Sequence, residues 1–226
     1  MEGNHRTRRR KMIRFIVTRH GQSIANAECR FAGHSDFDLS EIGKRQAELV
    51  ADYLCKNFEI DAIYSSDLLR AFNTALPTAN RLGIEITPMT SLREINAGEW
   101  EGRTTDEIQE IYTKDFDVWK NDYAHSRCTG GEATAEVYER AYRTICKIAK
   151  GNDGKTVYVS THATLLRALC LRSLGLSADE ANEIPFSHNA AICVFDFDGG
   201  KLTPVTLNIA EHLGDVITAV HSSFTK

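Results

Sequence analysis

Short apolar runs alternate along the chain with longer stretches in which apolar residues recur about every 3.6 positions. The short runs are rich in β-branched and aromatic residues, and they predict strands at Ile13–Thr18, Ala62–Ser65, Ile84–Thr87, Thr156–Ser160, Ile192–Phe197 and Lys201–Leu207. The longer stretches predict helices after Ser40, from about Asp67, after Thr104, around Val137–Ile148 and over Leu165–Leu174.

The order of these elements indicates an α/β fold. Strands that alternate with helices pair in parallel, so we expect a three-layer sandwich with a mostly parallel central sheet and helices on both faces. The last two strands are separated only by Asp198-Gly199-Gly200, which is typical of a tight turn. These strands are therefore predicted to form an antiparallel hairpin at the edge of the sheet.

Capping residues mark several helix ends. Ser40 is a typical N-cap, and Thr104 forms a capping box with Glu107 three residues later. Pro77 is expected to kink or end its helix, because proline lacks the N–H that the helix needs, and Gly83 is expected to cap that helix. With these helix ends, the predicted helices and strands are joined by short connections, as in one compact domain.

The helical and strand periodicities both fail between Asp115 and Gly131. Irregular segments of this length inside a domain are usually functional, so we expect a lid-like excursion around residues 115–131 that determines specificity. Its charged residues include Lys120, His125 and Arg127. The chain has no internal repeat and no linker, so residues 12–226 are predicted to form a single domain.

Composition excludes several classes of protein. The 226 residues are 42% hydrophobic, and 27 Lys and Arg against 31 Asp and Glu give a net charge of −4. With 15 Gly and 4 Pro, the chain is neither collagen-like nor of low complexity. Its longest apolar run, Ala190–Phe195, is far shorter than the ~20 residues of a membrane-spanning helix. We therefore expect a globular protein without a membrane partner.

Cysteine usage and the amino-terminal charges narrow the picture further. The six cysteines are scattered without a C-x-x-C pair, which predicts reduced thiols and a cytoplasmic location.

Residues 1–11 are strongly basic and are expected to be a disordered extension; the alternative is a tether to nucleic acid or an anionic surface. The extension lacks interleaved aromatic residues, so no nucleic-acid partner is predicted. A homodimer is left open.

Polar residues follow the predicted strands directly. Arg19 and His20 come after the first strand, Arg70 lies in the helix after the second, and His162 follows the strand that ends at Ser160. Ligands of open α/β sheets bind beyond the carboxyl ends of the strands, so these side chains are expected to converge there. Glu94, after the third strand, is the nearest candidate carboxylate.

This set of residues suits phosphoryl transfer. Hydrolysis of phosphate monoesters is among the slowest uncatalysed reactions, so several fixed cations must stabilise the charge on the transferred group. The planar fork of arginine binds such oxyanions in a bidentate manner. Two guanidinium groups beside His20 also disfavour its protonation, which leaves a ring nitrogen free to attack phosphorus. No histidine and carboxylate spacing fits a metal site, so neither a metal nor another cofactor is predicted.

The motifs resemble those of the histidine phosphatase superfamily, in its phosphoglycerate mutase-like branch. The resemblance covers nearly all of residues 12–213 and rests on motifs in the same order: Arg19-His20-Gly21, Asn26, Arg30-Phe31-Ala32-Gly33, Asp36–Ser40, Ser65–Ala71, Leu92-Arg93-Glu94 with Gly98, Trp100, Glu101 and Gly102, and Val159–His162. Arg-His-Gly alone is a weak signal, whereas this ordered set is specific.

The resemblance implies a phosphatase of the histidine acid type that hydrolyses small phosphorylated metabolites. His20 would become a phosphohistidine, and Glu94 would act as general acid and then as general base. The implied catalytic residues are His20, Glu94, His162, Arg19 and Arg70, and the implied substrate-binding residues are Arg19, Asn26, Ala32, Gly33, Arg70 and Ala163. The alternative function is a phosphoglycerate mutase, and a third is a non-catalytic module that binds phosphorylated ligands.

Some positions depart from the family pattern. Ala163 stands where glycine usually follows the second histidine, Gln22 replaces the commoner glutamate, and Ala25 replaces a bulky aromatic residue. In the glycolytic mutases, a tyrosine and a lysine occupy the positions held here by Ala97 and Thr105. An Arg-Arg pair is also missing after residue 10, so hydrolysis is predicted to dominate, although Arg103 and Arg127 could replace the missing cations.

Several residues remain open alternatives. Glu99 and Glu101 lie close enough to Glu94 in the sequence to be confused with it as the acid. His34 and His125 are candidates for the entrance of the site. His188 is left open between a role at the site and a hydrogen bond to the backbone of the hairpin, whereas His212 is interpreted as a structural residue.

Overall fold

The structure, a computed structural model, describes residues 11–218 and contains a mixed six-stranded sheet with the strand order β3-β2-β4-β1-β5-β6. The strands are β1 Ile13–Arg19, β2 Ala62–Ser65, β3 Ile86–Pro88, β4 Thr156–Thr161, β5 Ile192–Asp198 and β6 Lys201–Ile209. Strands β1 to β4 pair in parallel, whereas β5 and β6 run antiparallel at one edge. The predicted α/β sandwich with an edge hairpin is confirmed.

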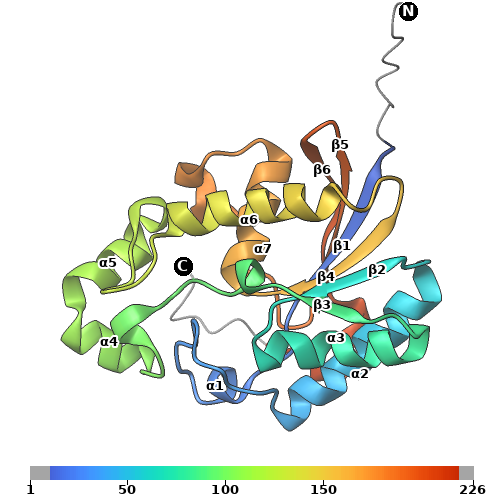
Figure 1. The fold of residues 1–226 in the computed structure, drawn as a ribbon. Coiled ribbons are helices and arrows are strands. Elements are labelled where there is room, and N and C mark those ends of the chain that lie inside the picture. Colours follow the sequence, from blue (N-terminus) through green and yellow to red (C-terminus); the bar gives the residue numbers. More distant parts are fainter. Residues whose placement is uncertain (1–10, 219–226) are drawn as a thin grey trace, which may run out of the picture.

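Helices cover both faces of the sheet (Figure 1). The α-helices are α1 Ile24–Ala27, α2 Glu41–Asn57, α3 Leu69–Leu82, α4 Thr105–Ile111, α5 Thr113–Asn121, α6 Thr134–Ala149 and α7 Ala163–Leu174. Short 3₁₀ helices are η1 Thr90–Leu92, η2 Gly98–Trp100, η3 Tyr123–His125, η4 Ala178–Glu183 and η5 Glu211–Val216. Helices α2 and α3 pack on one face, and α6 and α7 pack on the other.

The alternation of side chains along β1 explains the two hydrophobic clusters. Phe15 and Val17 belong to the cluster that includes Val137 of α6 and Leu169 of α7. Ile16, between them, belongs to the opposite cluster, which includes residues of α2 and α3. Successive strand residues point to opposite faces, so a strand with no polar alternation must be buried on both.

Helix α3 lies close to its predicted start, but Pro77 does not end it. The helix begins at Leu69, two residues after Asp67, whose carboxylate forms an ion pair with Arg93. It also continues through Pro77 as far as Leu82, and Gly83 caps it with a positive φ of 66° as expected. Packing of α3 against α2 and the sheet therefore outweighs the hydrogen bond that Pro77 removes.

The stretch 115–131 is more regular than the sequence suggests. Helix α5 occupies its first part and buries Phe116 and Trp119, and η3 follows it. A helix this short has only two buried apolar residues, which is too few to show a helical period. Strand β3 is also displaced from its predicted position, because it starts at Ile86 instead of Ile84.

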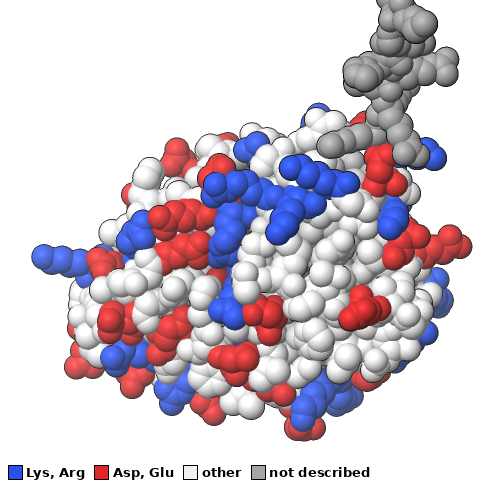
Figure 2. Space-filling model, in the orientation of Figure 1, with Lys and Arg blue, Asp and Glu red and all other residues white. Residues whose placement is uncertain are grey.

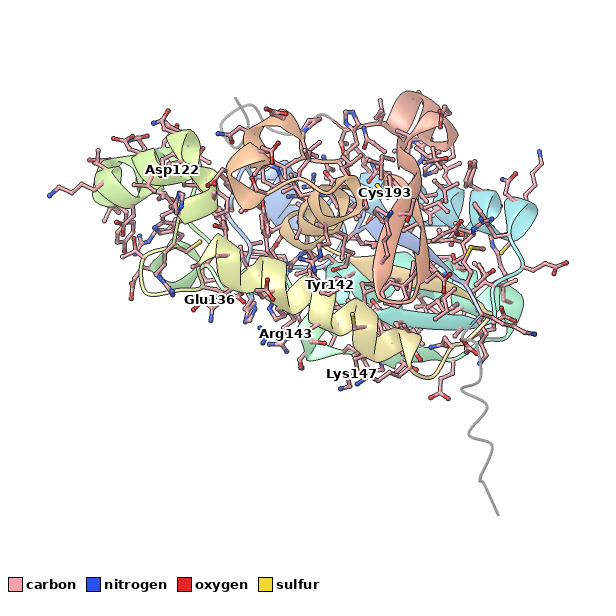
Figure 3. All side chains as sticks on the ribbon, turned by 90° about the horizontal axis from the view of Figure 1, so that it is seen from above. Asp122, Glu136, Tyr142, Arg143, Lys147 and Cys193 are labelled. Carbon is pink, nitrogen blue, oxygen red and sulfur yellow. The ribbon has the colours of Figure 1, made fainter. Side chains whose placement is uncertain are left out.

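The outer face of α6 is exposed and basic. Lys and Arg side chains gather over this helix in Figure 2, and Arg143 and Lys147 project from it in Figure 3. Tyr142 instead turns toward the edge hairpin, where its hydroxyl donates a hydrogen bond to the Gly200 carbonyl. Helix α6 therefore covers the sheet with its apolar side and presents charge to solvent.

Three further sequence predictions concern the amino-terminal extension, the cysteines and membrane-spanning helices. Residues 1–10, the greater part of the predicted basic extension, lie outside the described residues, and the Lys11 N–H donates to the Asp153 carboxylate at 2.7 Å. All six cysteines are free thiols. Within residues 11–218, no helix has both the length and the apolar character that a membrane crossing requires.

Candidate active site

The carboxyl ends of β1, β2 and β4 meet at one edge of the sheet. Strand β1 ends at Arg19, and the N–H of the next residue, His20, donates to the Thr161 carbonyl at the end of β4 at 2.9 Å. Arg70 lies in the first turn of α3, and His162 directly precedes α7. Residues that are far apart in sequence are thus brought together, as the parallel arrangement predicts.

A pocket of about 120 Å³ opens at this edge. The sequence-predicted site residues that line it are Arg19, His20, Asn26, Ala32, Arg70, Glu94 and Ala163. His162 does not line the pocket, but its ring packs edge-on against His20 with 5.1 Å between centroids. Gly33, expected to bind substrate, does not line the pocket either; its carbonyl accepts a hydrogen bond from Arg70 Nη2 at 2.8 Å. We refer to Arg19, His20, Arg70, Glu94 and His162 as the polar cluster.

His20 lines the pocket as a neutral imidazole. Its Nδ1 lies 2.7 Å from the Gly21 carbonyl oxygen, and because a carbonyl only accepts, Nδ1 carries the proton. Nε2 therefore keeps its lone pair. Burial, followed by the charges of Arg70 and Arg19, holds the pKa of His20 well below the usual histidine value. The ring is accordingly an uncharged nucleophile or base at neutral pH.

Arg70 is buried, and main-chain carbonyls orient it. Its guanidinium donates to the carbonyls of Ala32 at 2.7 Å, Gly33 at 2.8 Å and Ser35 at 2.9 Å. Burial lowers the pKa of Arg70 to about 10, so the group remains charged at neutral pH. A fixed cation of this kind can stabilise an oxyanion without reorganisation.

Arg19 and His162 carry buried polar atoms that lack hydrogen-bond partners among the described residues. Arg19 donates through Nη1 to the Ser187 carbonyl at 2.6 Å, whereas its Nε has no partner, and neither ring nitrogen of His162 has one. Burial lowers the pKa of Arg19 to about 10 and that of His162 well below its usual value. Buried polar atoms are almost always hydrogen-bonded, so this grouping indicates a polar ligand.

Glu94 is the carboxylate of the pocket. It is buried, and its Oε1 accepts from the Ile95 N–H at 2.8 Å, while the Thr164 N–H at the start of α7 approaches Oε2 at 3.2 Å. Glu101, a sequence alternative for the acid, instead accepts hydrogen bonds from Ser35 and its neighbours, and Glu99 is exposed. Of these three carboxylates, only Glu94 lines the pocket among the described residues.

Arg140 of α6 holds the loop that carries Glu94. Two of its N–H groups bind the Glu132 carboxylate at 2.7 and 2.9 Å. The others donate to the carbonyls of Ser91 at 3.1 Å, Arg93 at 2.7 Å and Glu94 at 3.2 Å. All five N–H groups of the guanidinium are therefore in use, and Arg140 orients the loop and has no donor left for a ligand.

Gly33 permits a close approach that no other residue could make. A Cβ at this position would lie 2.3 Å from the Ile95 carbonyl oxygen and 2.5 Å from Glu101 Oε1. Both distances are far below van der Waals contact. The loop that orients Arg70 is thus packed directly on the loop that carries Glu94.

Asn189 supports the nucleophile from the other side. Its Nδ2 donates to the His20 carbonyl at 3.2 Å and to Asn26 Oδ1 at 3.1 Å. The next residue, Ala190, has a positive φ of 60°, and its N–H donates to the carbonyls of Arg19 and His20. The segment before β5 therefore fixes the backbone of the Arg-His motif.

Three aromatic side chains form the apolar part of the pocket, and we refer to Phe31, Trp119 and Phe186 as the aromatic wall. Trp119 comes from the stretch 115–131, as expected for a segment at the active face. Lys120, His125 and Arg127 from the same stretch do not line the pocket, because they bind Gln109, Asp122 and Glu136 instead. Substrate recognition by these charges, as the sequence suggested, is therefore not supported.

The other histidines within residues 11–218 lie outside the pocket. His34 Nε2 lies 3.1 Å from the Glu94 carbonyl, so it supports the acid loop. His125 is exposed and contacts Asp122. His188 Nδ1 contacts the Thr218 carbonyl, and His212 Nε2 contacts the Ala190 carbonyl, each at 3.1 Å. The contact of His212 agrees with its interpretation as a structural residue, and His188 makes a contact of the same kind.

Sequence reasoning missed residues that hold the polar cluster in place. Arg140 and Asn189 sit in a helix and a loop whose local pattern shows only a polar residue. Trp119 was missed because Phe116 is the only other buried apolar residue of α5, and two positions do not show a helical period. Metal binding finds no support in the described part of the chain, which contains no group of three or more His, Cys, Asp or Glu arranged for it.

Comparison with known proteins agrees with this geometry. The profile of the histidine phosphatase superfamily (branch 1) matches residues 15–210. Phosphoserine phosphatase 1 from Hydrogenobacter thermophilus is 32% identical over 212 residues, which cover 94% of this chain and 100% of that protein. Glucosyl-3-phosphoglycerate phosphatase from Mycolicibacterium vanbaalenii is 34% identical over 177 residues, which cover 75% of this chain and 77% of that protein.

Solved structures show the same architecture. YhfR from Bacillus stearothermophilus aligns with a TM-score of 0.84 and 29% identity, over 89% of this chain and 99% of that chain. Residues 15–210, which match the family profile, include the strands that carry the polar cluster and the loops that orient it. The motifs, the fold and the relatives therefore lead to one conclusion: this chain belongs to the histidine phosphatase superfamily.

Proposed function

We propose that this protein is a phosphatase that hydrolyses small phosphomonoesters through a phosphohistidine on His20. The observation that carries the proposal is the state of this ring: Nδ1 is held by the Gly21 carbonyl, and burial, together with the guanidinium charges of Arg70 and Arg19, keeps the imidazole neutral. A neutral Nε2 beside two fixed cations is what attack on a phosphate dianion requires. In enzyme class this is a phosphoric monoester hydrolase of the histidine acid type.

The proposed reaction has two steps. In the first, Nε2 of His20 forms a bond to phosphorus while the bond to the leaving oxygen breaks, and Glu94 gives that oxygen a proton. In the second, Glu94 takes a proton from water as the water attacks the phosphohistidine, which releases inorganic phosphate and restores His20. Arg19, Arg70 and His162 stabilise the phosphoryl oxygens in both steps. The chemistry proceeds without a metal.

Small phosphorylated acids are the substrate class to test first. The names of the relatives support this choice, since one is a phosphoserine phosphatase and another acts on glucosyl-3-phosphoglycerate. The size of the pocket, about 120 Å³, also suits a compact leaving group. We further propose that residues 12–226 act as one domain, in which the excursion around residues 115–131 supplies part of the pocket through Trp119.

Mutase activity is the less favoured alternative. A mutase must grip the carboxylate of its substrate while the phosphoryl group is transferred back. Ala97 and Thr105 offer no cation, Arg103 donates to the Glu99 carbonyl, and Arg127 pairs with Glu136. None of these four residues lines the described pocket.

Turnover of L-phosphoserine and an aryl phosphate by the purified full chain tests the proposal. We expect release of inorganic phosphate that a chelator leaves unchanged, and an acid-labile phosphoenzyme on His20 when the reaction is quenched. Activity that is lost with the chelator and restored by divalent ions would contradict the mechanism. With 3-phosphoglycerate, 2-phosphoglycerate formed faster than phosphate would make the protein a mutase.

A further inference from the structure

Arg167 is a buried arginine close to the active site that the proposed mechanism does not use. It lies in α7, five residues after His162, and only 7% of it is exposed. None of the ion pairs within residues 11–218 includes it. Burying an unpaired charge is costly, so other groups must stabilise this guanidinium.

Two segments supply these groups. Nε of Arg167 donates to the Ile184 carbonyl at 2.9 Å, and Nη2 donates to the Ala181 carbonyl. The guanidinium also packs against two rings that contact each other edge-on, with its carbon 4.5 Å from the centroid of Tyr123 and 4.3 Å from that of Phe186. One side chain therefore joins η3 and the segment 181–186 to α7.

The segment that Arg167 holds leads directly into the active site. Phe186 belongs to the aromatic wall of the pocket. The carbonyl of the next residue, Ser187, accepts the hydrogen bond from Arg19 Nη1 at 2.6 Å. This is the only hydrogen bond that the Arg19 guanidinium makes to the described residues, so the position of Ser187 sets its orientation.

A second connection runs through Tyr123. Its hydroxyl donates to Thr164 Oγ1 at 3.4 Å, and the Thr164 N–H lies 3.2 Å from the Glu94 carboxylate. The connection from Arg167 to Glu94 through Tyr123 and Thr164 has more steps than the connection to Arg19 through Ser187. The experiment below is therefore designed around Arg19.

We propose that Arg167 is a positioning residue for phosphoryl transfer, which fixes the segment 181–187 and thereby orients the Arg19 guanidinium toward the phosphoryl oxygens. The inference rests on the proposed phosphatase function. A small displacement of a group that binds the transition state costs about 100-fold in rate, so Arg167 is expected to matter although it never touches the substrate.

The experiment measures inhibition by orthovanadate, which adopts the five-coordinate geometry of phosphoryl transfer, in Arg167→Met and Arg167→Lys. The methionine removes the donors, whereas the lysine keeps the charge but loses the planar fork that reaches both carbonyls. We expect vanadate affinity and kcat/KM to fall about 10- to 100-fold in both variants. If the methionine variant does not fold, the lysine variant is the one that decides.

Arg14→Met is the matched control. This substitution also removes a guanidinium, in this case one that pairs with Asp196. Arg14 lies beside Thr156, at the end of β1 opposite to Arg19. Its vanadate affinity and kcat/KM should equal those of the wild type. Folded Arg167 variants that bind vanadate as tightly as the wild type would overturn the inference.

The route through Arg19 is tested by a double-mutant cycle. When Arg19→Lys has already removed the oriented fork, adding Arg167→Met should weaken vanadate binding by less than about 3-fold, because residues that act through one another are not additive. The full loss in both backgrounds would overturn the proposed route. A wild-type protein that neither binds vanadate nor hydrolyses phosphomonoesters would instead refute the phosphatase function itself.

Discussion

The polar cluster and the aromatic wall share one pocket but are held by different means. Main-chain groups at strand ends and in neighbouring loops orient the polar cluster, as the three carbonyls around Arg70 illustrate. The aromatic wall is held by ring contacts between segments far apart in sequence. Phe31 and Trp119 pack edge-on with centroids 5.3 Å apart, and Phe186 packs edge-on against Tyr123 at 5.7 Å.

This difference separates reactivity from selectivity. A group oriented by the backbone keeps its position when neighbouring side chains change, whereas a wall of packed rings changes shape with each substitution. Changes in the polar cluster should therefore lower the turnover of every substrate. Changes in the wall should alter the choice of leaving group and leave the chemistry intact.

The largest expected effect comes from removing the nucleophile. His20→Ala should lower kcat by roughly 10⁴- to 10⁶-fold for any phosphomonoester, as loss of a catalytic nucleophile does elsewhere. His125→Ala, in the segment that supplies Trp119, removes an exposed histidine and should leave kcat unchanged. Assays with an aryl phosphate, together with thermal melting, check both variants. Substantial turnover by a folded His20→Ala protein would refute the phosphohistidine mechanism.

A smaller effect is expected from Glu94→Gln, which keeps size and polarity but cannot transfer a proton. General acid catalysis contributes about 10²- to 10⁴-fold, so L-phosphoserine, with its poor leaving group, should lose that much rate. An aryl phosphate, which leaves without help, should lose less. Equal losses on both substrates would show that another group is the acid. Glu99→Gln, at an exposed carboxylate outside the pocket, is the control and should keep the wild-type rates.

Trp119→Leu addresses the other side of the comparison. It shortens the aromatic wall without touching the polar cluster, so kcat/KM should change about 10- to 100-fold for L-phosphoserine relative to an aryl phosphate. Inhibition by orthovanadate should stay at its wild-type value, because vanadate has no leaving group. A loss of vanadate affinity equal to the loss of kcat/KM would mean that wall and cluster are not separate.

The smallest expected effect is on stability as a function of pH. The pKa values of His20 and His162 are lowered in the folded protein, mainly by burial. As the pH falls below about 6.5, the unfolded chain binds protons that the folded protein does not, so the free energy of unfolding decreases by up to about 1.4 kcal/mol per pH unit for each histidine. Above that pH the two groups contribute no slope.

Chemical denaturation between pH 5 and 8 measures this slope. His20→Ala should reduce it, since one of the two histidines is gone. His125→Ala should act above about pH 6.5 instead: the hydrogen bond to Asp122 and the charge of that carboxylate raise the pKa of His125 in the folded protein, so its protonation stabilises the fold as the pH falls toward 6.5, and the variant should lose that gain. A wild-type protein whose stability is independent of pH between 5 and 6.5 would contradict the burial of neutral histidines.

The sequence predicted what local patterns can encode. Each arginine or histidine of the polar cluster follows a buried strand within a few residues, so an apolar run and the polar residues after it were enough to place them. The insertion of β4 between β2 and β1 has no local signal, because it depends on how the whole chain packs. That Pro77 does not end its helix also has no local signal, since the packing of α3 outweighs the preference of one residue.

The residues that orient the polar cluster could not be predicted because their partners are distant. Arg140 binds the Glu94 carbonyl across 46 positions, and Asn189 binds the His20 carbonyl across 169. No periodicity links such pairs in one sequence. Only the folded chain shows that these side chains donate to main-chain carbonyls of the active-site residues Glu94 and His20.

The carbonyl acceptors of Arg70, Arg140 and Arg167 have a consequence for how such a protein can evolve. Every residue type has a main-chain carbonyl, so substitution at Ala32, Ser35 or Ile184 does not remove the acceptor that an arginine uses. The orientation of these guanidinium groups is therefore robust to mutation in the loops around them. New leaving-group preferences can be acquired one substitution at a time, while the catalytic geometry is inherited unchanged.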